Sequence, residues 1–402
     1  MIAFLKVTII FALIVSAIIN KLPLVWALFG GSFILGVSFG LPLIEIFKSA
    51  LSSTISWNTL KIVIVLYLIA ILENILRNKE MLKNMVQSLK NLIKDPRLTL
   101  ISMPMIMGLL PSVGGALFSA PLLEEASSGN DISPEKKGFL NFWFRHVWEP
   151  FLPVYPGIIL ASTLSGISLP ILIKEALPYG LAVFIIGLFI GFYKLSLNKE
   201  EVTESNWKNE LFNFFTSFWP FIIILFSVLV LHFDILFVLL LILILLLLIF
   251  RYTPLEIKNT LIESLKIENL LLIIAVMVFK GLLERVNAVS DISYFFSSLN
   301  IPLIIIFFTL PFLVGLLTGV TQASIGITFP IILSLIPYGE SIKWVTFSFI
   351  SGYIGVMMSP AHLCLVLTRE YYQAEWNKLY PEVIKAGIIL IIFNFFLKIF
   401  NF

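Results

Sequence analysis

Long apolar runs, separated by short polar or proline-containing segments, cover most of the chain. They occupy residues 3–20, 23–43, 59–76, 98–121, 139–165, 175–193, 212–231, 233–250, 268–284, 301–335, 343–368 and 383–400. An α-helix needs roughly 20 apolar residues to cross the hydrocarbon core of a bilayer. The pattern therefore predicts an all-α integral membrane protein.

Two of these runs differ from the rest, because Gly, Pro, Ser and Thr interrupt them near their middles. Non-helical backbone at membrane depth must find its hydrogen-bond partners within the protein, since lipid offers none. We therefore expect two re-entrant hairpins, at about 98–125 and about 303–335. The other ten runs are expected to be transmembrane helices.

The basic residues support this topology. Six of them lie in the loop 77–98, which marks that loop as cytoplasmic. With both hairpins counted as re-entrant, Lys21, Lys136 and Lys266 also lie inside. Both termini then lie on the outer side of the cytoplasmic (inner) membrane, and residues 196–211 form a cytoplasmic linker. The first run also resembles a secretory signal, but it leads straight into a second apolar run, which favours a spanning helix.

The chain contains an internal repeat. Residues 98–165 align with 305–372 at a fixed offset of 207 without a gap, and Pro42–Glu45 resembles Pro254–Glu256. The alignment matches Pro104 with Pro311, Gly108 with Gly315, Val113 with Val320, Ala116 with Ala323, and Pro153 with Pro360. Chance similarity between apolar segments would explain matched leucines. It does not readily explain matched Gly and Pro, which therefore favour a true repeat.

Each half holds five expected crossings, an odd number, so the second half is inverted relative to the first. The first repeat is residues 1–195, with a broken helix at 139–165. The second is residues 212–402, with a broken helix at 343–368. Inverted repeats are typical of secondary transporters, whose binding sites lie at the repeat interface.

An amphipathic segment precedes each hairpin, at 79–95 and, less cleanly, at 285–300. Such helices lie in the membrane interface. They are either arms that link a fixed part to a moving part, or plain surface helices.

Composition narrows the class of protein. Hydrophobic residues make up 59% of the 402 residues and charged residues 13%, whereas soluble domains have about a quarter charged residues. A net charge of +3 argues against a nucleic-acid partner, and a single cysteine excludes a disulfide scaffold.

The sequence lacks common enzyme motifs. It has no Walker A, G-x-S-x-G or CxxC motif, and His146 to Glu149 reads H-x-x-E rather than H-E-x-x-H. We therefore expect a protein that is not an enzyme and has no cofactor. Na⁺ or H⁺ would be the coupling ion, unless a separate chain supplies ATP hydrolysis.

The hairpin tips are the first candidate binding elements. Gly and Pro end the helices there, and the half-helix ends carry partial charges that can meet an anion or Na⁺. The Na⁺ ligands are not identified by the pattern, and close helix packing through small residues is the alternative. The candidate residues are Ser112, Gly114, Gly115 and Ser119 in the first tip, and Thr318, Gly319, Thr321, Gln322 and Ser324 in the second.

The helix after each hairpin is also expected to break. Three prolines between residues 150 and 156 are incompatible with a regular helix, and Glu149 and Tyr155 flank them. The matching segment of the second half contains Ser359, Pro360 and His362. These breaks are expected to face the two tips and to complete a pair of cavities.

Ionisable residues within membrane segments are candidate functional groups. Glu149 is a candidate cation ligand or proton carrier. His362 is a candidate to bond a substrate carboxylate or to titrate near neutral pH, and the alternative is a satisfied core histidine. Arg145 and His146 are candidate charge partners. Arg145 and Glu149, four residues apart, alternatively form an internal ion pair. Cys364 is most simply a small apolar filler.

This order of elements resembles the ion transporter superfamily: helices, a hairpin with a Gly/Ser/Thr tip, a proline-broken helix, and the same again inverted. The superfamily includes sodium–dicarboxylate carriers, sodium–proton antiporters and arsenite pumps. Within it, the chain resembles, over nearly its whole length, the ten-helix domain of unknown function family 401.

The resemblance implies an elevator mechanism and a homodimer. The scaffold helices would be roughly 23–43, 59–76, 233–250 and 268–284. The dicarboxylate carriers have a Ser-Asn-Thr triplet at each tip. Here Ser112-Val113-Gly114 and Gly319-Val320-Thr321 take those positions, so a dicarboxylate substrate and two Na⁺ sites do not carry over directly.

The sequence thus predicts a secondary active transporter of a small, anionic, carboxylate-type solute, working by symport with Na⁺ or H⁺. One alternative is a cation–proton antiporter that uses Glu149. A second is an intramembrane enzyme acting on lipid, which would need a paired catalytic constellation that the sequence does not contain.

Overall fold

The protein is helical throughout the part of the chain that the structure describes. This computed structural model describes residues 2–93, 95–112, 115–197, 206–288, 301–337 and 339–400, with side chains from residue 5 onward. Within these ranges the regular elements are α-helices and one 3₁₀ turn, with no strand. The prediction of an all-α protein is confirmed.

The helix bounds follow the apolar runs closely. The first half contains α1 (Ile2–Ile19), α2 (Leu24–Ser38), α3 (Leu43–Ile55), α4 (Trp57–Asn78), α5 (Met81–Leu92), α6 (Pro96–Met107), α7 (Ala116–Ala126), α8 (Pro134–Arg145), α9 (Pro156–Ser165) and α10 (Leu169–Gly191). The second half contains α11 (Trp207–Leu229), α12 (Ile235–Ile249), α13 (Pro254–Glu263), α14 (Ile267–Arg285), α16 (Leu303–Thr318), α17 (Thr321–Ile332), the 3₁₀ turn η1 (Leu333–Leu335), α18 (Ser341–Met357), α19 (Leu363–Tyr372) and α20 (Trp376–Ile399).

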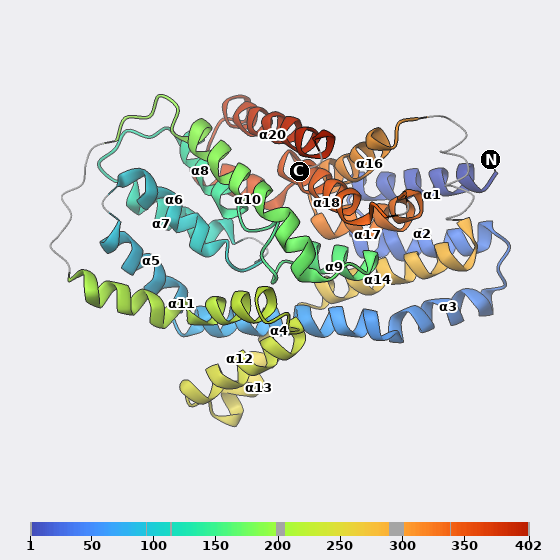
Figure 1. The fold of residues 1–402 in the computed structure, drawn as a ribbon, viewed down its shortest axis with the longest axis horizontal. Coiled ribbons are helices and arrows are strands. Elements are labelled where there is room, and N and C mark those ends of the chain that lie inside the picture. Colours follow the sequence, from blue (N-terminus) through green and yellow to red (C-terminus); the bar gives the residue numbers. More distant parts are fainter. Residues whose placement is uncertain are drawn as a thin grey trace.

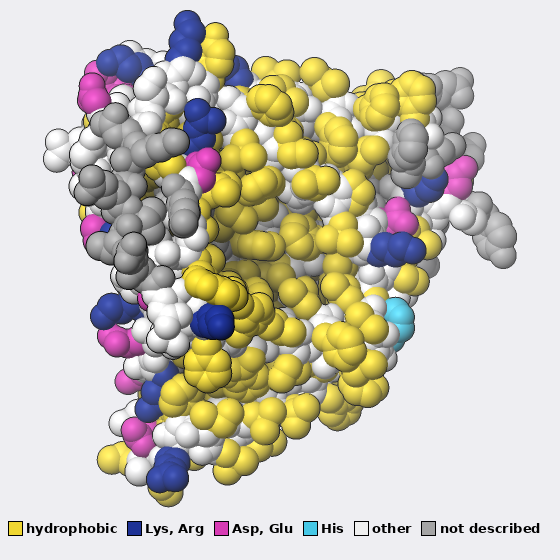
Figure 2. Space-filling model, turned by 60° about the vertical axis from the view of Figure 1, so that its left-hand side comes forward, with side chains coloured by type: hydrophobic (Ala, Val, Ile, Leu, Met, Phe, Trp, Pro, Cys, Tyr) yellow, Lys and Arg dark blue, Asp and Glu magenta, His cyan; other side chains and the backbone are white. Residues whose placement is uncertain are grey.

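A broad apolar face covers much of the surface. Figure 2 shows hydrophobic side chains across the middle of one view, with Lys, Arg, Asp and Glu gathered toward its edges. Soluble monomers rarely expose apolar patches larger than a few hundred Å². Among the described residues, α4, α10 and α11 are long and apolar enough to cross a membrane on their own. The total of ten crossings stays a prediction.

Two helices, α3 and α13, lie where no apolar run predicted one. The start of α13 carries a capping box: the Thr253 side chain accepts from the Glu256 backbone, and the Glu256 carboxylate accepts from the Thr253 backbone. These bonds from Thr253 hold the pKa of Glu256 below its ordinary value. A proline stands at the start of each helix: Pro42 immediately precedes α3, and Pro254 is the first residue of α13. The repeat alignment pairs these two positions.

The interrupted runs form two helical hairpins. Helix α6 packs against α7, and α16 packs against α17. Residues 113 and 114 of the first tip, including the candidate Gly114, lie outside the described residues. In the second tip Gly319 has a φ of +66° and ends α16, a conformation that glycine adopts without strain.

The amphipathic helix expected at 79–95 is α5, whereas most of its expected counterpart at 285–300 lies outside the described residues.

The chain leaves the helical conformation at both positions where the sequence predicted a break. Helix α8 ends at Arg145 and α9 begins only at Pro156, while α18 ends at Met357 and α19 begins at Leu363. The contacts across the breaks are reciprocal between the two halves: α8 packs on α19 and α18 on α9, and likewise α7 packs on α19 and α17 on α9. The hairpins and broken helices thus form one intertwined unit.

Helices α2, α3, α4 and α14 lie to one side of this unit. Helix α14 packs against α2, α3 and α4, and also against α17 of the second hairpin. In Figure 1, α3 and α4 run along the lower edge of the molecule, with α12 and α13 below α4. The second hairpin is therefore in direct contact with helices outside the intertwined unit.

Candidate functional site

A cavity of about 520 Å³ lies where the two hairpin tips meet the two helix breaks. Nine of the residues that the sequence predicted line it: Ser112, Arg145, His146, Glu149, Tyr155, Gly319, Thr321, Gln322 and His362. They come from both halves of the chain. The sequence predicted a pair of cavities, whereas here both tips and both breaks contribute to one.

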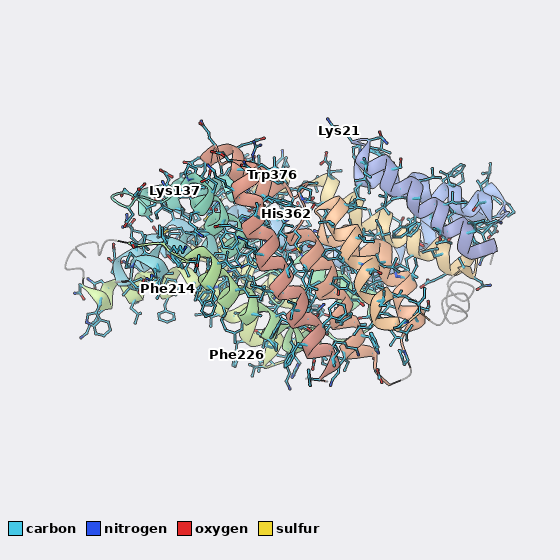
Figure 3. All side chains as sticks on the ribbon, turned by 90° about the horizontal axis from the view of Figure 1, so that it is seen from above. Lys21, Lys137, Phe214, Phe226, His362 and Trp376 are labelled. Atoms are coloured by element: carbon cyan, nitrogen blue, oxygen red, sulfur yellow. The ribbon has the colours of Figure 1, made fainter. Side chains whose placement is uncertain are left out.

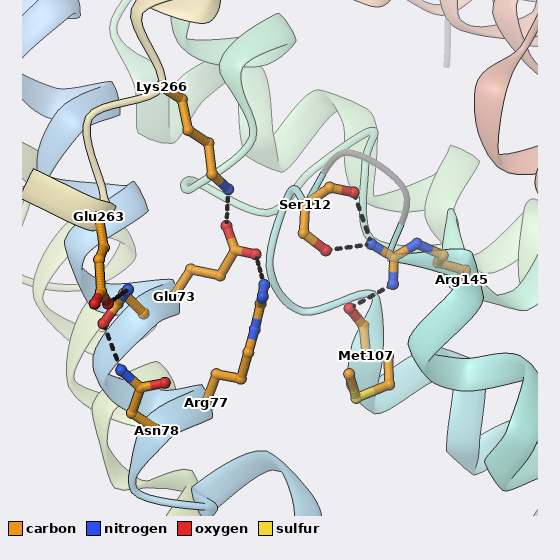
Figure 4. Close-up of polar contacts among 9 residues, drawn as sticks. Glu73, Arg77, Asn78, Met107, Ser112, Arg145, Glu263 and Lys266 are labelled. Carbon is orange, nitrogen blue, oxygen red and sulfur yellow. Dashed lines mark hydrogen bonds and ion pairs between the residues drawn. The ribbon is translucent and has the colours of Figure 1, made fainter. Parts of the chain in front are cut away.

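Arg145 holds the first tip together. From the last turn of α8 its guanidinium donates to the Met107 carbonyl (2.8 Å), the Ser112 carbonyl (3.1 Å) and the Ser112 hydroxyl (2.8 Å) (Figure 4). The residue is 2% exposed. Within the described residues, no carboxylate lies within ion-pair distance of it.

The expected alternative of an Arg145–Glu149 ion pair is wrong. That pairing required both residues on one helical face, but α8 ends at Arg145 and the chain leaves the helix before Glu149. The two side chains instead contact opposite halves of the chain, since Arg145 bonds to the first hairpin and Glu149 to the second.

Two glycines allow the first tip to close around Arg145. A Cβ at Gly108 would lie 2.1 Å from the Arg145 carbonyl oxygen, and a Cβ at Gly115 would lie 2.0 Å from Nη2 of Arg145. The Tyr155 hydroxyl, from the first break, donates to the Gly108 carbonyl. Gly108, Gly115 and Tyr155 therefore shape the site by packing around Arg145 and the tip.

Glu149 joins the first break to the second tip. The hydroxyl of Thr321, the first residue of α17, donates to the Glu149 carboxylate, and both residues are buried. Gly157 makes room for this contact, because a Cβ there would lie 2.6 Å from Cγ2 of Thr321. The carboxylate thus sits in the cavity wall, at the boundary between the two halves.

The two histidines of the breaks face each other. The ring centroids of His146 and His362 are 4.7 Å apart, at 79° to each other. Nδ1 of His146 bonds to the Phe142 carbonyl (2.7 Å), and Nδ1 of His362 bonds to the Val356 carbonyl (3.0 Å). Figure 3 places His362 in the middle of the molecule, between Lys137 and Lys21 in that view.

The remaining predicted residues that the structure describes do not line the cavity, and most of them satisfy local backbone groups. The hydroxyls of Ser119, Thr318 and Ser324 donate to the carbonyls of Ala116 (3.2 Å), Val314 (2.7 Å) and Pro311 (2.7 Å). The Ser359 hydroxyl accepts from the Ala361 backbone (3.2 Å). These residues brace the tips and the second break.

The mouth of the cavity is formed by residues that the sequence did not single out. Trp26, Glu268 and Asn269 line it from the starts of α2 and α14. Both helices begin just after residues that the predicted topology places inside, Lys21 and Lys266. In that topology the cavity opens toward the cytoplasm. No motif distinguishes these three residues in the sequence.

Glu73 is a buried carboxylate that the sequence reasoning passed over. It is 3% exposed on α4 and pairs with Arg77 on the same helix and with Lys266, which precedes α14, at 2.8 Å (Figure 4). Its sequence signal is that Glu73 is the only carboxylate within the apolar run 59–76. This pairing fastens α4 to the start of α14.

Replacing Glu73 with glutamine is expected to destabilise the protein by about 2 kcal/mol, because two cations lose their shared partner. The cost stays below that of a fully buried pair, since Arg77 and Lys266 are 43% and 38% exposed. The thermal unfolding midpoint in detergent should fall by a few degrees. Glu80→Gln, which removes the exposed pair with Lys83, is the control. An equal shift in both variants would contradict the assignment.

The helical fold and its broad apolar face are those of a membrane protein, with a cavity lined by residues of both halves. The structure is similar to that of the Alcanivorax borkumensis YdaH transporter, with a TM-score of 0.61 and 13% identity, over 89% of this chain and 88% of that one. The chain belongs to the family described as protein of unknown function DUF401, whose model matches residues 3–399. No curated protein sequence matches it. The family that the sequence resembled is thereby confirmed.

Proposed function

We propose that this protein is a secondary active transporter that carries a small carboxylate-type anion across the cytoplasmic membrane, coupled to Na⁺ or H⁺. The observation that carries the proposal is the environment of the Arg145 side chain. It lines the cavity, it is almost fully buried, and its three bonded acceptors are neutral oxygens.

A buried cation without an ionic partner is costly, and an anion arriving in the cavity would offset that cost. The planar guanidinium suits a carboxylate, because it presents several N–H donors in a fixed fork. Gln322 adds amide donors on the opposite tip. The volume of about 520 Å³ lies within the usual range of small-molecule pockets.

We further propose two inverted repeats and an elevator mechanism, in which the hairpins and broken helices move together against a scaffold. The reciprocal packing of α7 on α19 and of α17 on α9 supports a two-fold relation between the halves. The position of the cavity supports the elevator, because its wall comes from the hairpins and breaks while α2 and α14 form its mouth. A homodimer assembled through the scaffold belongs to the same proposal.

The test is solid-supported-membrane electrophysiology on proteoliposomes, with mono- and dicarboxylates applied with and without a Na⁺ or pH gradient. We expect a carboxylate-dependent current that is lost or at least tenfold reduced in Ser112→Ala and Thr321→Val. Thr309→Val is the matched control, because that half-buried threonine on α16 does not line the cavity and its hydroxyl donates to the Ile305 carbonyl of its own helix. A carboxylate current of the same size in all three variants would contradict the site.

A cation–proton antiporter is the second candidate, and the buried Glu149–Thr321 contact favours it. An antiporter needs a titrating carboxylate in the cavity but no organic solute. The same recordings separate the two functions. A Na⁺-driven proton current without any carboxylate would favour the antiporter, whereas silence until a carboxylate is added would favour the symporter.

A further inference from the structure

The chain has three histidines and one cysteine in 402 residues, and three of these four residues meet beside the cavity. They are His146, His362 and Cys364, all of them buried. Their ligand atoms lie within 4.8 Å of one another. Both histidines and the cysteine also line the cavity described above.

The histidine rings are oriented as metal ligands usually are. Nδ1 of each ring bonds to a backbone carbonyl, which can only accept, so Nδ1 carries the proton and Nε2 is left with a lone pair. Histidines that bind metals commonly donate their second ring nitrogen to a carbonyl in this way. Phe142 packs against both rings, at centroid distances of 4.9 and 5.1 Å, and restricts their rotation.

The cysteine is placed to complete the set. Cys364 lies in the first turn of α19, two residues after His362, which is the N-cap of that helix. The N-terminus of a helix stabilises negative charge, and a thiolate is the form of cysteine that binds metals. His146 comes from the other half of the chain, just after α8. The three donors therefore join the two helix breaks.

We propose that His146, His362 and Cys364 form a binding site for a borderline-soft transition-metal ion such as Zn²⁺. Two imidazoles and a thiolate suit Zn²⁺, Co²⁺ or Cu⁺, whereas Na⁺, Mg²⁺ and Ca²⁺ prefer oxygen ligands. Three protein ligands leave a fourth position open toward the cavity, for water or an anionic ligand. The sequence had suggested only an apolar filler at Cys364 and no cofactor.

The geometry requires a small contraction on binding. Tetrahedral zinc with ordinary Zn–N and Zn–S bonds places neighbouring ligand atoms about 3.3–3.6 Å apart, compared with separations of up to 4.8 Å here. Closing by about 1 Å would draw the two breaks together. The site does not depend on which solute or coupling ion the transporter uses.

The test is a Co²⁺ titration of the full-length protein in detergent, prepared without a histidine tag. We expect a near-ultraviolet thiolate-to-cobalt charge-transfer band, visible bands of tetrahedral cobalt, and loss of both when Zn²⁺ is added. Cys364→Ser should remove the charge-transfer band, and His146→Gln or His362→Gln should weaken Co²⁺ binding at least tenfold.

His232→Gln is the matched control, because His232 is exposed near the start of α12 and belongs to a different cavity. Its spectrum should equal that of the wild type. Each variant is compared by size-exclusion chromatography and circular dichroism, so that a lost band is read only from folded protein. The absence of a charge-transfer band in the wild type, or a band of equal affinity in folded His362→Gln, would overturn the proposal.

Discussion

Replacing Arg145 with glutamine is expected to abolish carboxylate-driven transport and to destabilise the first hairpin tip. Hydrogen bonds from a charged donor contribute about 1.5–3 kcal/mol each, and Arg145 makes three, to Met107 and Ser112. Glutamine can replace at most part of them, so we expect a loss of about 3 kcal/mol in stability. The loss of the charge should weaken solute binding by about 100-fold if the solute carboxylate bonds to the guanidinium.

A second variant distinguishes the structural role of Arg145 from its role in solute binding. Arg145→Lys keeps the positive charge but loses the planar fork, so its stability should fall while some carboxylate binding remains. Solute affinity is measured by isothermal titration calorimetry and stability by thermal unfolding of the same preparations. Arg97→Gln, an exposed charge at the start of α6, is the control. Unchanged carboxylate affinity in folded Arg145→Gln would show that the solute does not bind this residue.

Much of the helical architecture could be predicted from the sequence, because two strong signals mark it. Apolar length predicted most of the helices, and clustered prolines indicated the break after Arg145, which the structure places between α8 and α9. Helices α3 and α13 were missed because neither is a long apolar run. Thr253 and Glu256 nevertheless formed a readable capping box.

The site was only partly predictable, because its contacts depend on which segments meet in space. Helix periodicity suggested that Arg145 and Glu149 pair, but a break between them sends each to a different hairpin. The sequence also could not show that His146 lies against His362, 216 positions away, or that Cys364 joins them. Residue types and local breaks are encoded locally, whereas these long-range pairings are set by the packing of α8 on α19.

Replacing Glu149 with glutamine is expected to uncouple the transporter while sparing solute exchange. Glutamine has the same size and can still accept the Thr321 hydroxyl, so the contact between the first break and the second tip should persist. Glutamine cannot carry a proton or neutralise a bound Na⁺. The substitution thus removes the only carboxylate that the sequence predicted in the cavity. Gradient-driven accumulation should therefore fall at least tenfold, whereas exchange of labelled for unlabelled solute should change less than about threefold.

Both activities are measured in the same proteoliposomes, so that differences in reconstitution cancel. Glu268→Gln is the matched control, because this carboxylate is exposed at the mouth of the cavity, where the loss of one charge is screened by solvent. It should accumulate solute as the wild type does. Thr321→Val tests the contact itself: it removes the donor to Glu149 but keeps the carboxylate, and should impair exchange and accumulation together. Accumulation by Glu149→Gln at the wild-type rate would assign the coupling ion to another residue, since a neutral side chain at position 149 cannot exchange charge with the gradient.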